Sequence, residues 1–387
     1  MNPDQCIGTG NCVESCPEKD VLGLLSGQAT PVSPARCIGH GLCERSCPVN
    51  AIELVFGTSR RGVDLPRIQE NFETNVPSLY VVGELGGMGL IKNAFEQGRQ
   101  CIDGISVPSP NDSDVLDLLI VGCGPAGLSC AIQAVEKGFS YRVIEKDGVG
   151  GTVLNYPKKK LVMTEPMDLP GTFSMAKRDY AKEELLEIWQ GLVDELQIKI
   201  NEEEIVLTVD RLASGHFSVR TNKDDYTAQN IVLAIGRRGI PRKLDVPGEA
   251  LPKVAYALKD ATDFAGDRVL VVGGGDSAVE AALTLSEQSN TQVHISYRKE
   301  AFFRIKTDNQ TRLNTAIKAG RIQLIMNSNV SEIRTDQTII AREKEPDLIL
   351  PNDFVFIFAG GSLPTEFLNK CGIKIDTVFG ARSRPSK

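Results

Sequence analysis

Six cysteines near the N-terminus form one pattern that occurs twice. Cys6, Cys12 and Cys16 are followed by Pro17, and Cys37, Cys43 and Cys47 are followed by Pro48. The offset is the same for all three pairs, because 37−6, 43−12 and 47−16 each equal 31. Thiolates in the run C-x2-C-x2-C-x3-C-P hold two iron–sulfur clusters, and the last cysteine of each run binds the cluster of the other run. The repeat therefore predicts one-electron chemistry in this part of the chain.

Each run lacks its second cysteine, which is Thr9 in the first run and His40 in the second. With the crossed arrangement, one cluster is held by Cys6, Cys12 and Cys47, and the other by Cys37, Cys43 and Cys16. Three thiolates can hold a [3Fe–4S] cluster, or a [4Fe–4S] cluster whose fourth iron takes another ligand. His40 is a candidate for that ligand or else a surface residue, whereas Thr9 would leave an open site, a water or a hydroxide. The alternative is that this segment has lost its clusters and binds zinc or no metal. The unbroken repeat argues against this alternative.

A glycine loop between a strand and a helix indicates a second kind of chemistry. Gly122, Gly124 and Gly127 satisfy G-x-G-x-x-G between a strand expected at 115–121 and a helix that runs to about residue 136. In this motif the first glycine makes the tight turn, the second lets the pyrophosphate approach the backbone, and the third lets the helix pack closely on the strand. The N-terminus of the helix then faces the phosphates. Glu145 ends the strand expected at 141–144, where a carboxylate accepts hydrogen bonds from ribose hydroxyls. The motif predicts a dinucleotide site, and an ordinary glycine turn is the competing interpretation.

The motif returns at Gly273, Gly275 and Ala278, between a strand expected at 269–272 and a helix to about residue 287. The following strand is expected at 292–297, and it is followed by Arg298 and Lys299 where the first site has an acid. An arginine at this place accommodates a 2′-phosphate, which favours NADP over NAD, although a solvated basic turn has the same composition. The two loops together predict FAD at the first site and NADPH at the second.

Composition narrows the class of protein. The 387 residues exceed a single core and predict two or three domains, and the net charge of −7 opposes a nucleic-acid partner. Ten cysteines in a secreted protein would suggest disulfides, but no signal peptide is visible and the spacing is that of cluster ligands. No apolar run approaches the length of a membrane-spanning helix. We expect a soluble cytoplasmic protein with no membrane partner.

The chain resembles two known families. The cysteine repeat is similar to a bacterial two-cluster ferredoxin with one ligand changed per cluster. About residues 114–370 resemble the low-molecular-weight thioredoxin reductase branch of the flavoprotein disulfide reductases, and bacillithiol-disulfide-reductase-like proteins in particular. The motifs that carry this resemblance are Gly122–Gly127 with Glu145, Gly150-Gly151-Thr152, Ala234-Ile235-Gly236, Asn155-Tyr156-Pro157, and Gly273–Ala278 with Arg298.

Two features of that family are missing from their usual places. The family closes its FAD domain with a strand, a glycine–aspartate pair and a helix after the last strand, and here residues 74–105 resemble that segment, ahead of the first glycine loop. Gly83 and Glu84 would be the pair, with glutamate in place of aspartate, so we expect a circularly permuted FAD domain. The redox cysteines are also absent: no cysteine lies between Cys130 and Cys371, and Ala126 occupies the position of the loop cysteine. A dithiol relay is therefore not expected.

The expected fold class is α/β, with two Rossmann-like dinucleotide-binding domains and a small N-terminal α+β ferredoxin-like domain. The predicted boundaries are 1–55 for the iron–sulfur domain, 56–240 with 350–387 for the FAD domain (56–110 as its permuted closing segment), and 241–349 for the NAD(P) domain. The candidate FAD residues are Gly122, Gly124, Pro125, Ala126, Gly127, Glu145, Lys146, Gly151, Thr152, Gly83 and Glu84. The candidate NADP residues are Gly273, Gly275, Asp276, Ser277, Ala278, Arg298 and Lys299. The candidate metal ligands are Cys6, Cys12, Cys16, Cys37, Cys43, Cys47 and His40.

The function predicted from these sites is an NADPH-dependent flavoprotein oxidoreductase. It would pass electrons between NADPH, FAD and the clusters, to or from an external carrier such as ferredoxin, flavodoxin or another electron-carrier subunit. The family resemblance implies a homodimer. Two alternatives remain open at this stage: a reductase of low-molecular-weight disulfides, and a non-enzymatic redox sensor or electron-transfer subunit.

Overall fold

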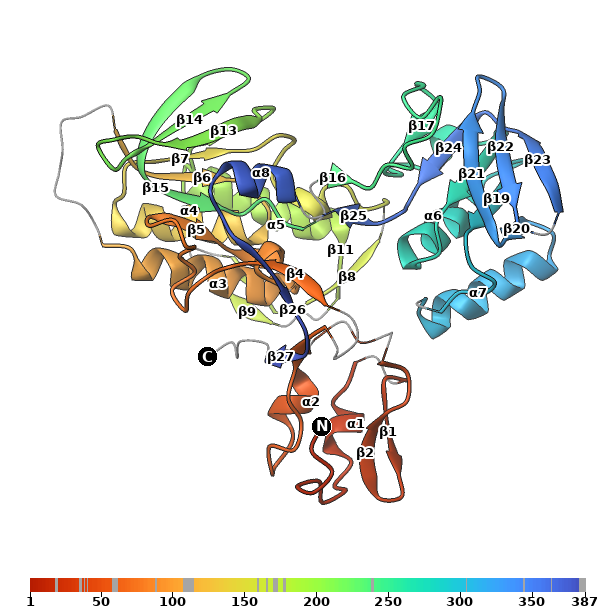
Figure 1. The fold of residues 1–387 in the computed structure, drawn as a ribbon, viewed down its shortest axis with the longest axis horizontal. Helices are drawn as coiled ribbons and strands as arrows, with labels where there is room; N and C mark the ends of the chain where they lie inside the picture. Colours follow the sequence, from red (N-terminus) through yellow and green to blue (C-terminus); the bar gives the residue numbers. More distant parts are fainter. Residues whose placement is uncertain are drawn as a thin grey trace. The chain divides into compact units, whose positions relative to one another are not determined.

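The computed structural model describes residues 1–17, 20–34, 37, 39, 41–57, 62–87, 89–106, 115–158, 160–164, 166–169, 173–176, 179–237, 240–303, 305–343, 345–362 and 364–382. The chain divides into two compact units, each mixed α/β as the sequence predicted (Figure 1). One unit comprises Met1–Glu53, Asn155–Lys158 and Pro241–Gly361, and the other comprises Leu54–Leu154, Lys159–Ile240 and Ser362–Lys387. No helix of the described residues is long and apolar enough to cross a bilayer.

The N-terminal 53 residues hold short elements around a small core. Helix α1 (Asn11–Glu14) and helix α2 (Leu42–Arg45) flank the hairpin of β1 (Leu22–Leu25) and β2 (Gln28–Pro31). The core consists of Cys12, Val21, Leu22 and Ile52, with Cys16, Cys43 and Cys47 packed against it. With so few buried apolar side chains, this segment has little hydrophobic core of its own to stabilise it.

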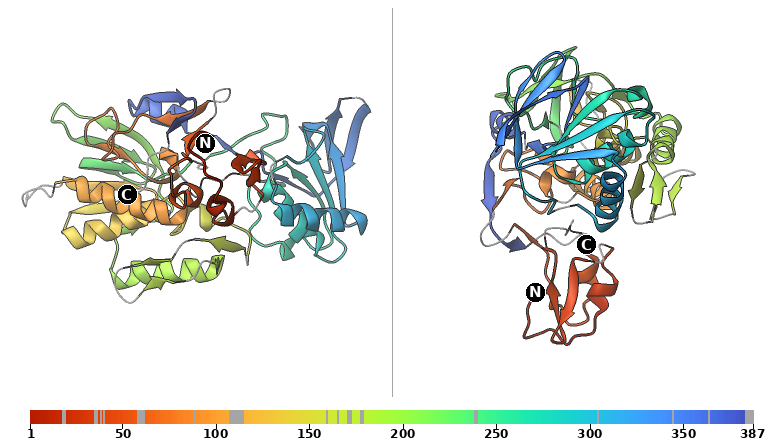
Figure 2. Two further views of the ribbon diagram at one scale, coloured as in Figure 1. Left: turned by 90° about the horizontal axis from the view of Figure 1, so that it is seen from below. Right: turned by 90° about the vertical axis from the view of Figure 1, so that its right-hand side faces the viewer.

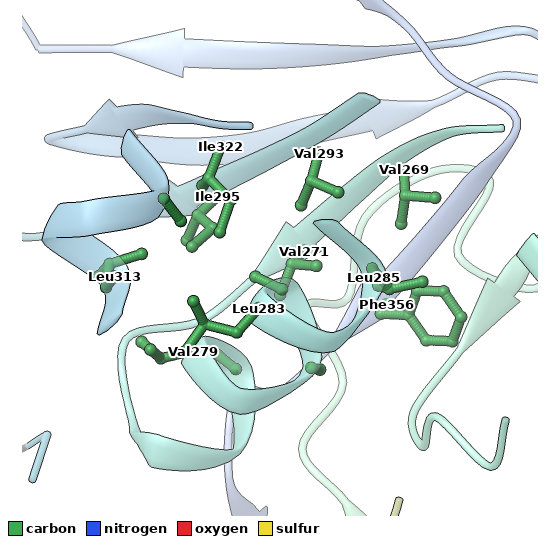
Figure 3. Packing of buried hydrophobic residues seen from close by; sticks show 14 of the residues in the cluster. Val269, Val271, Val279, Leu283, Leu285, Val293, Ile295, Leu313, Ile322 and Phe356 are labelled. Carbon is green, nitrogen blue, oxygen red and sulfur yellow. The ribbon is translucent and has the colours of Figure 1, made fainter. Parts of the chain in front are cut away.

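Residues 241–361 form three layers. The middle layer is a parallel sheet in the order β17 (Val254–Ala255), β24 (Phe354–Ile357), β18 (Arg268–Val272), β19 (Gln292–Tyr297) and β20 (Ile322–Met326). One face packs on α6 (Asp276–Ser286) and α7 (Thr307–Lys318), where Val271 and Ile295 point toward Val279 and Leu283 of α6 (Figure 3). The other face packs on the antiparallel strands β21 (Ser328–Ile333), β22 (Gln337–Arg342) and β23 (Glu345–Pro351).

One predicted boundary differs from this arrangement. The sequence analysis placed residues 350–387 with the FAD domain, but β24 pairs in parallel with both β17 and β18, so the segment up to residue 361 packs with the 241–349 segment. An apolar strand such as Phe354–Ile357 suits the interior of either sheet, and its pairing partners are set by contacts distant in sequence.

The other unit is built on a seven-stranded sheet. Its main path runs β12 (Ile200–Asn201), β7 (Tyr141–Ile144), β6 (Leu116–Val121), β15 (Asp225–Leu233), β14 (Phe217–Thr221) and β13 (Val206–Arg211). The seventh strand, β5 (Leu79–Val81), pairs in parallel with the second half of β15, with Leu79 opposite Ile231 and Val81 opposite Leu233. Continuous apolar runs fit strands that are buried on both faces, and Leu118, Leu119 and Ile120 of β6 are fully buried.

Two helices from distant parts of the sequence lie side by side under this sheet. Helix α3 (Ile91–Gly104) packs along α4 (Pro125–Lys137), as both Figure 1 and the left view of Figure 2 show. The contact is close because Gly98 has no side chain: a Cβ there would lie 2.4 Å from the Ala126 carbonyl oxygen. Ser129 donates a hydrogen bond to the Phe95 carbonyl across the same interface. Segment 79–104 is therefore tied to the first glycine loop through both β5 and α3.

The C-terminal residues return to the segment around residues 55–75. Strand β26 (Ile375–Val378) pairs with β4 (Val63–Pro66), and β27 (Ala381–Arg382) pairs with β3 (Val55–Phe56), both antiparallel. Arg67 forms a bidentate ion pair with Asp376, at 2.7 and 2.8 Å. The remaining elements are α5 (Lys182–Glu195), α8 (Thr365–Lys370), the 3-10 helices Gly83–Gly86, Gly151–Val153 and Thr262–Phe264, and the short strands β8 (Leu161–Met163), β9 (Met167–Asp168), β10 (Ser174–Met175), β11 (Asp179–Ala181), β16 (Ile240–Pro241) and β25 (Gly361–Ser362).

Candidate functional site

The first glycine loop connects β6 to α4. Gly122 has φ 100°, a conformation that favours glycine, and its amide donates to the Ile144 carbonyl of β7 at 2.8 Å. Gly127 lies against the same turn, since a Cβ at residue 127 would fall 1.9 Å from the Gly122 carbonyl oxygen. A side chain at either position would push the helix away from the strand. The loop therefore presents the first amides of α4 at the carboxyl edge of the sheet, where dinucleotide phosphates bind.

Glu145 lies at the end of β7, beside this loop, with only 4% of its surface exposed. Its Oε2 accepts a hydrogen bond from the Cys123 amide at 2.5 Å, and its Oε1 accepts one from the Asp147 amide at 3.0 Å. Burial raises the pKa of this carboxyl, while the two amides act in the opposite direction. A buried carboxylate has accepting capacity beyond two amides. The chemistry of the site therefore suits the hydroxyl groups of a ribose.

Two further segments with FAD candidates reach the same loop. A Cβ on Gly151 would lie 2.9 Å from Gly124 Cα, so the segment holding Gly151 and Thr152 packs directly on the loop. A Cβ on Gly83 would lie 2.9 Å from the Cβ of Ala126, and the Gly83 amide donates to Gln97 Oε1 at 2.8 Å. The other candidates fall in the same segments: Pro125 is the first residue of α4, Lys146 is exposed beside Asp147, and Glu84 is half-buried in the turn after Gly83.

The second glycine loop connects β18 to α6 in the same way. Gly273 has φ 148°, and a Cβ there would lie 2.6 Å from the Phe358 carbonyl oxygen. Gly275 differs, because its φ of −106° suits any residue and a Cβ would meet no described atom within 4 Å. The absent side chain of Gly275 thus leaves open space at the N-terminus of α6. That space is where the motif places a pyrophosphate, so the residues present fit a dinucleotide.

Asp276 has protein partners that the sequence did not reveal. Its Oδ1 accepts hydrogen bonds from the Lys306 amide at 2.8 Å and from Asn309 Nδ2 at 2.7 Å, which ties the start of α6 to the start of α7. Asn309 is itself 5% exposed. Asp276 thus positions the loop, while Ser277 is exposed and Ala278 is fully buried under the helix.

Arg298 and Lys299 lie at the same edge of the sheet as the second glycine loop, because β18 and β19 are neighbours with Val272 opposite Ser296. Both side chains are exposed. Lys299 Nζ lies 5.5 Å from the centre of the Phe303 ring, whereas Arg298 has no ion-pair partner within the described part of the chain. Tyr297, which the sequence analysis did not select, covers Gly274: a Cβ there would be 2.2 Å from its ring. The ring stacks on Phe302 at 5.3 Å.

In the N-terminal segment, Cys6, Cys12 and Cys47 line one small cavity that is partly open to solvent. These are the three cysteines that the crossed arrangement assigns to one cluster, and Thr9 lines the same cavity. Among the described residues, no three Cys, His, Asp or Glu side chains lie together as they would around a single ion. The three thiols instead line one pocket together, and thiolates are the ligands that iron–sulfur clusters take, so the chemistry of this donor set fits an iron–sulfur group.

Backbone amides support two of these thiols. The Ala29 amide donates to Cys6 Sγ at 3.4 Å, and the Ala51 amide donates to Cys47 Sγ at 3.2 Å. The amides of Ala29 and Gly8 lower the pKa of the Cys6 thiol, because they stabilise the thiolate. Hydrogen bonds to cluster sulfurs also tune the reduction potential.

The second trio consists of Cys16, Cys37 and Cys43. Burial raises the pKa of the Cys43 thiol, and electrostatic interaction with Cys16 and Cys37 acts in the same direction. Cys37 is exposed, and Cys16 and Cys43 are half-buried. His40, the candidate fourth ligand, lies outside the described residues.

The cysteines outside the repeat are all buried. Cys123 and Cys130 are inaccessible to solvent, and burial raises the pKa of each thiol far above its ordinary value. Cys101 is also fully buried, and burial raises the pKa of Cys371 to about 12. Thiols of this kind are poor nucleophiles and suit packing more than disulfide exchange.

Comparison with known families gives two matches. Residues 119–380 match the pyridine nucleotide-disulphide oxidoreductase family, and residues 1–48 match the 4Fe-4S dicluster domain. The matched ranges contain both glycine loops in one case and all six repeat cysteines in the other.

Individual relatives match about two thirds of this chain. The chain is 31% identical over 267 residues to bacilliredoxin reductase Bdr of Bacillus subtilis, which spans 68% of this chain and 82% of that protein. It is also 31% identical over 269 residues to a ferredoxin–NADP reductase of Ignicoccus hospitalis, covering 67% of this chain and 82% of that protein. The solved structure of bacillithiol disulfide reductase Bdr from Staphylococcus aureus matches with a TM-score of 0.60 and 28% identity, over 68% of this chain and 84% of that one.

Proposed function

The chain belongs to the pyridine nucleotide-disulphide oxidoreductase family, and on that premise we propose that it is an NADPH-dependent flavoprotein oxidoreductase that exchanges electrons with an external carrier through its own iron–sulfur clusters. It is an NAD(P)H-dependent oxidoreductase with FAD and NADP(H) sites and a 4Fe-4S dicluster domain.

One observation carries the proposal. The cavity lined by Cys6, Cys12 and Cys47 belongs to the same polypeptide as two strand–glycine–helix loops of the dinucleotide-binding type, and the second of these has open space at Gly275. NADPH supplies hydride, FAD accepts two electrons and releases them singly, and clusters carry one electron at a time. A chain with all three kinds of site has what it needs to convert between two-electron and one-electron carriers.

The residues have separate tasks in this scheme. The Gly122 loop and Glu145 hold the pyrophosphate and ribose of FAD, and the buried carboxylate fixes the orientation of the nucleotide. The Gly275 loop holds the pyrophosphate of NADPH, while the exposed Arg298 pairs with the 2′-phosphate. The six repeat cysteines hold two clusters, each with three protein thiolates.

The external partner is proposed to be an electron carrier of the ferredoxin or flavodoxin type, or a subunit with further redox centres. A relative at 31% identity is named a ferredoxin–NADP reductase, which supports a carrier of this chemistry. We further propose a homodimer and a circularly permuted FAD domain, in which residues 74–105 are the closing segment. Support for the permutation comes from the pairing of β5 with β15 and the packing of α3 on α4.

The experiment that tests the function is anaerobic purification followed by iron and sulfide analysis and an NADPH titration. We expect broad absorption beyond the flavin bands, with both chromophores bleached by NADPH and electrons delivered to a ferredoxin or a one-electron dye. A Cys12→Ser, Cys47→Ser double variant should keep flavin reduction and lose delivery to ferredoxin, whereas Cys371→Ala should keep both. A flavin-only spectrum without iron, or delivery that survives loss of the clusters, would contradict the proposal.

A second candidate function is reduction of a low-molecular-weight disulfide, which the 31% identity to a bacilliredoxin reductase favours. The buried Cys123 and Cys130 and the alanine at residue 126 argue against a thiol relay at the flavin. Turnover of a disulfide with iron-free protein would favour this candidate, and turnover lost in Cys123→Ala would identify the thiol.

A further inference from the structure

The cavity that holds Cys6, Cys12 and Cys47 offers three protein thiolates and no fourth. Among the described residues, the polar side chains on its wall apart from these thiols belong to Asn2 and Thr9, and none of the described lining residues carries an imidazole or a carboxylate. Thr9 stands at the position of the missing cysteine in the run, between Gly8 and Gly10. Thiolate is a much better iron ligand than a neutral hydroxyl or amide. A four-iron cluster in this cavity would therefore keep one iron without a strong protein ligand.

That corner of the cavity is open to solvent. Thr9 is exposed, and its neighbour Ile7 is 65% exposed at the cavity wall. Leu24, which is 45% exposed, and the half-buried Val49 also line the cavity. Apart from Asn2 and Thr9, the side chains at this rim are apolar, and they can contact the carbon atoms of a small organic ligand.

We propose that the iron nearest Thr9 binds a small organic thiolate from solution. This inference rests on the proposed function only in requiring that the cluster is present. Cys6, Cys12 and Cys47 would hold the cluster, and the thiolate would supply the sulfur ligand that Thr9 does not. Binding would be a ligand exchange without change of oxidation state, in which the thiol loses its proton and the displaced ligand leaves.

The test uses the full chain, reconstituted anaerobically with 57Fe and titrated with 2-mercaptoethanol while Mössbauer and EPR spectra are recorded. We expect one iron of the wild-type cluster to shift saturably with thiol concentration. Thr9→Cys should supply the fourth thiolate, show the thiol-bound spectrum from the start, and lose the response to added thiol. Thr9→Val, which keeps the shape of the side chain and removes the hydroxyl, should respond as the wild type does.

Three outcomes would overturn the inference. One is a cluster that stays three-iron in the presence of excess iron, since it has no iron at this corner. Another is a four-iron cluster that does not respond to 2-mercaptoethanol, or that responds only to inorganic sulfide. The last is an unchanged response in Thr9→Cys, which would place the thiol on the other cluster. Bleaching of the same samples by NADPH is recorded separately and tests the proposed function. Failure of the thiol response can therefore be distinguished from failure of the proposed function.

Discussion

The hydroxyl groups of Ser15 and Ser46 lie 2.8 Å apart and join the two halves of the cysteine repeat. The two serines obey the repeat themselves, because they are 31 residues apart. Each follows one short helix, and Ser46 also lies 3.3 Å from the Cys43 carbonyl oxygen while Ser15 lies 3.4 Å from that of Cys12. Each also directly precedes the cysteine that crosses to the other cluster. The bond therefore holds Cys16 and Cys47 in place between the two cluster sites.

We predict that this bond stabilises the cluster-bound state. Ser15→Ala and Ser46→Ala should each lower the free energy of unfolding of the N-terminal segment by about 0.5–1.5 kcal/mol, followed through cluster absorbance in denaturant. The double variant should lose less than the sum of the single variants, because either change already removes the shared bond. Ser26→Ala, on the exposed turn between β1 and β2, is the matched control. Strict additivity of the two changes would show that the hydroxyls act independently.

Gly275 and Gly273 allow nucleotide binding to be separated from folding. Gly275→Ala fills space that no described atom occupies, so it should raise the KM for NADPH by on the order of 10-fold or more, equivalent to ~1.4 kcal/mol. Thermal stability without nucleotide should be unchanged. Gly273→Ala instead meets the Phe358 carbonyl at a φ of 148°, and should lower stability by about 1–3 kcal/mol. Steady-state kinetics measure the change in KM, and calorimetry measures the change in stability. An unaltered KM in Gly275→Ala would show that the pyrophosphate does not bind at this loop.

Arg298 should determine the preference for NADPH over NADH. Its exposed guanidinium can form charge-assisted hydrogen bonds with a 2′-phosphate, which contribute about 1.5–3 kcal/mol. Arg298→Ser should therefore lower kcat/KM for NADPH by about 10- to 100-fold and leave the value for NADH nearly unchanged. Lys299→Ser is the comparison, because its ammonium already lies over the Phe303 ring. Equal losses with both coenzymes would mean that Arg298 supports the fold instead of reading the phosphate.

Sequence patterns located the chemistry better than the contacts that support it. The strands 141–144 and 292–297 were predicted to the residue, since the apolar pattern that predicts them is local. The motif placed Asp276 at the nucleotide, but its bonds to Lys306 and Asn309 come from about 30 residues further along and leave no local trace. Contacts distant in sequence likewise determine which sheet β24 joins, because it pairs with β17 and β18. The pair Ser15 and Ser46, in contrast, was visible in the same 31-residue offset as the cysteines.

Glu145 should control the retention of FAD. Glu145→Ala leaves the buried amide of Cys123 and the amide of Asp147 without their acceptor, at a cost of about 1–3 kcal/mol, and also removes the partner of the ribose. We expect the dissociation constant of FAD to rise by about 10- to 100-fold, measured from flavin fluorescence on dilution. Glu187→Ala, an exposed glutamate of α5, should have no effect. Full FAD content in Glu145→Ala would show that the carboxylate serves only the loop.

A chain in the unpermuted order should still bind FAD. Arg382 pairs with Val55 across β27 and β3, so these residues already stand opposite each other as the last pair of a hairpin would. A chain that runs from residue 115 to 382, then through a short glycine-rich turn into residues 55–106, keeps every strand pairing of the unit. The cut between 106 and 115 breaks the chain between α3 and β6. Both elements contact α4, so α3 keeps its packing in the rejoined chain.

We expect this rejoined chain to bind FAD in the same ratio as the natural chain and to be reduced by NADPH. Chain termini that lie close together generally tolerate such rearrangement. Residues 115–382 alone are the control. They lack both β5, which pairs with β15, and α3, which packs on α4, so we expect them to lose FAD. Flavin content and the flavin circular dichroism band measure both chains. If the shortened chain retained FAD, residues 55–106 would not be the closing segment of the domain; if the rejoined chain lost it, the position of that segment in the sequence would itself be essential.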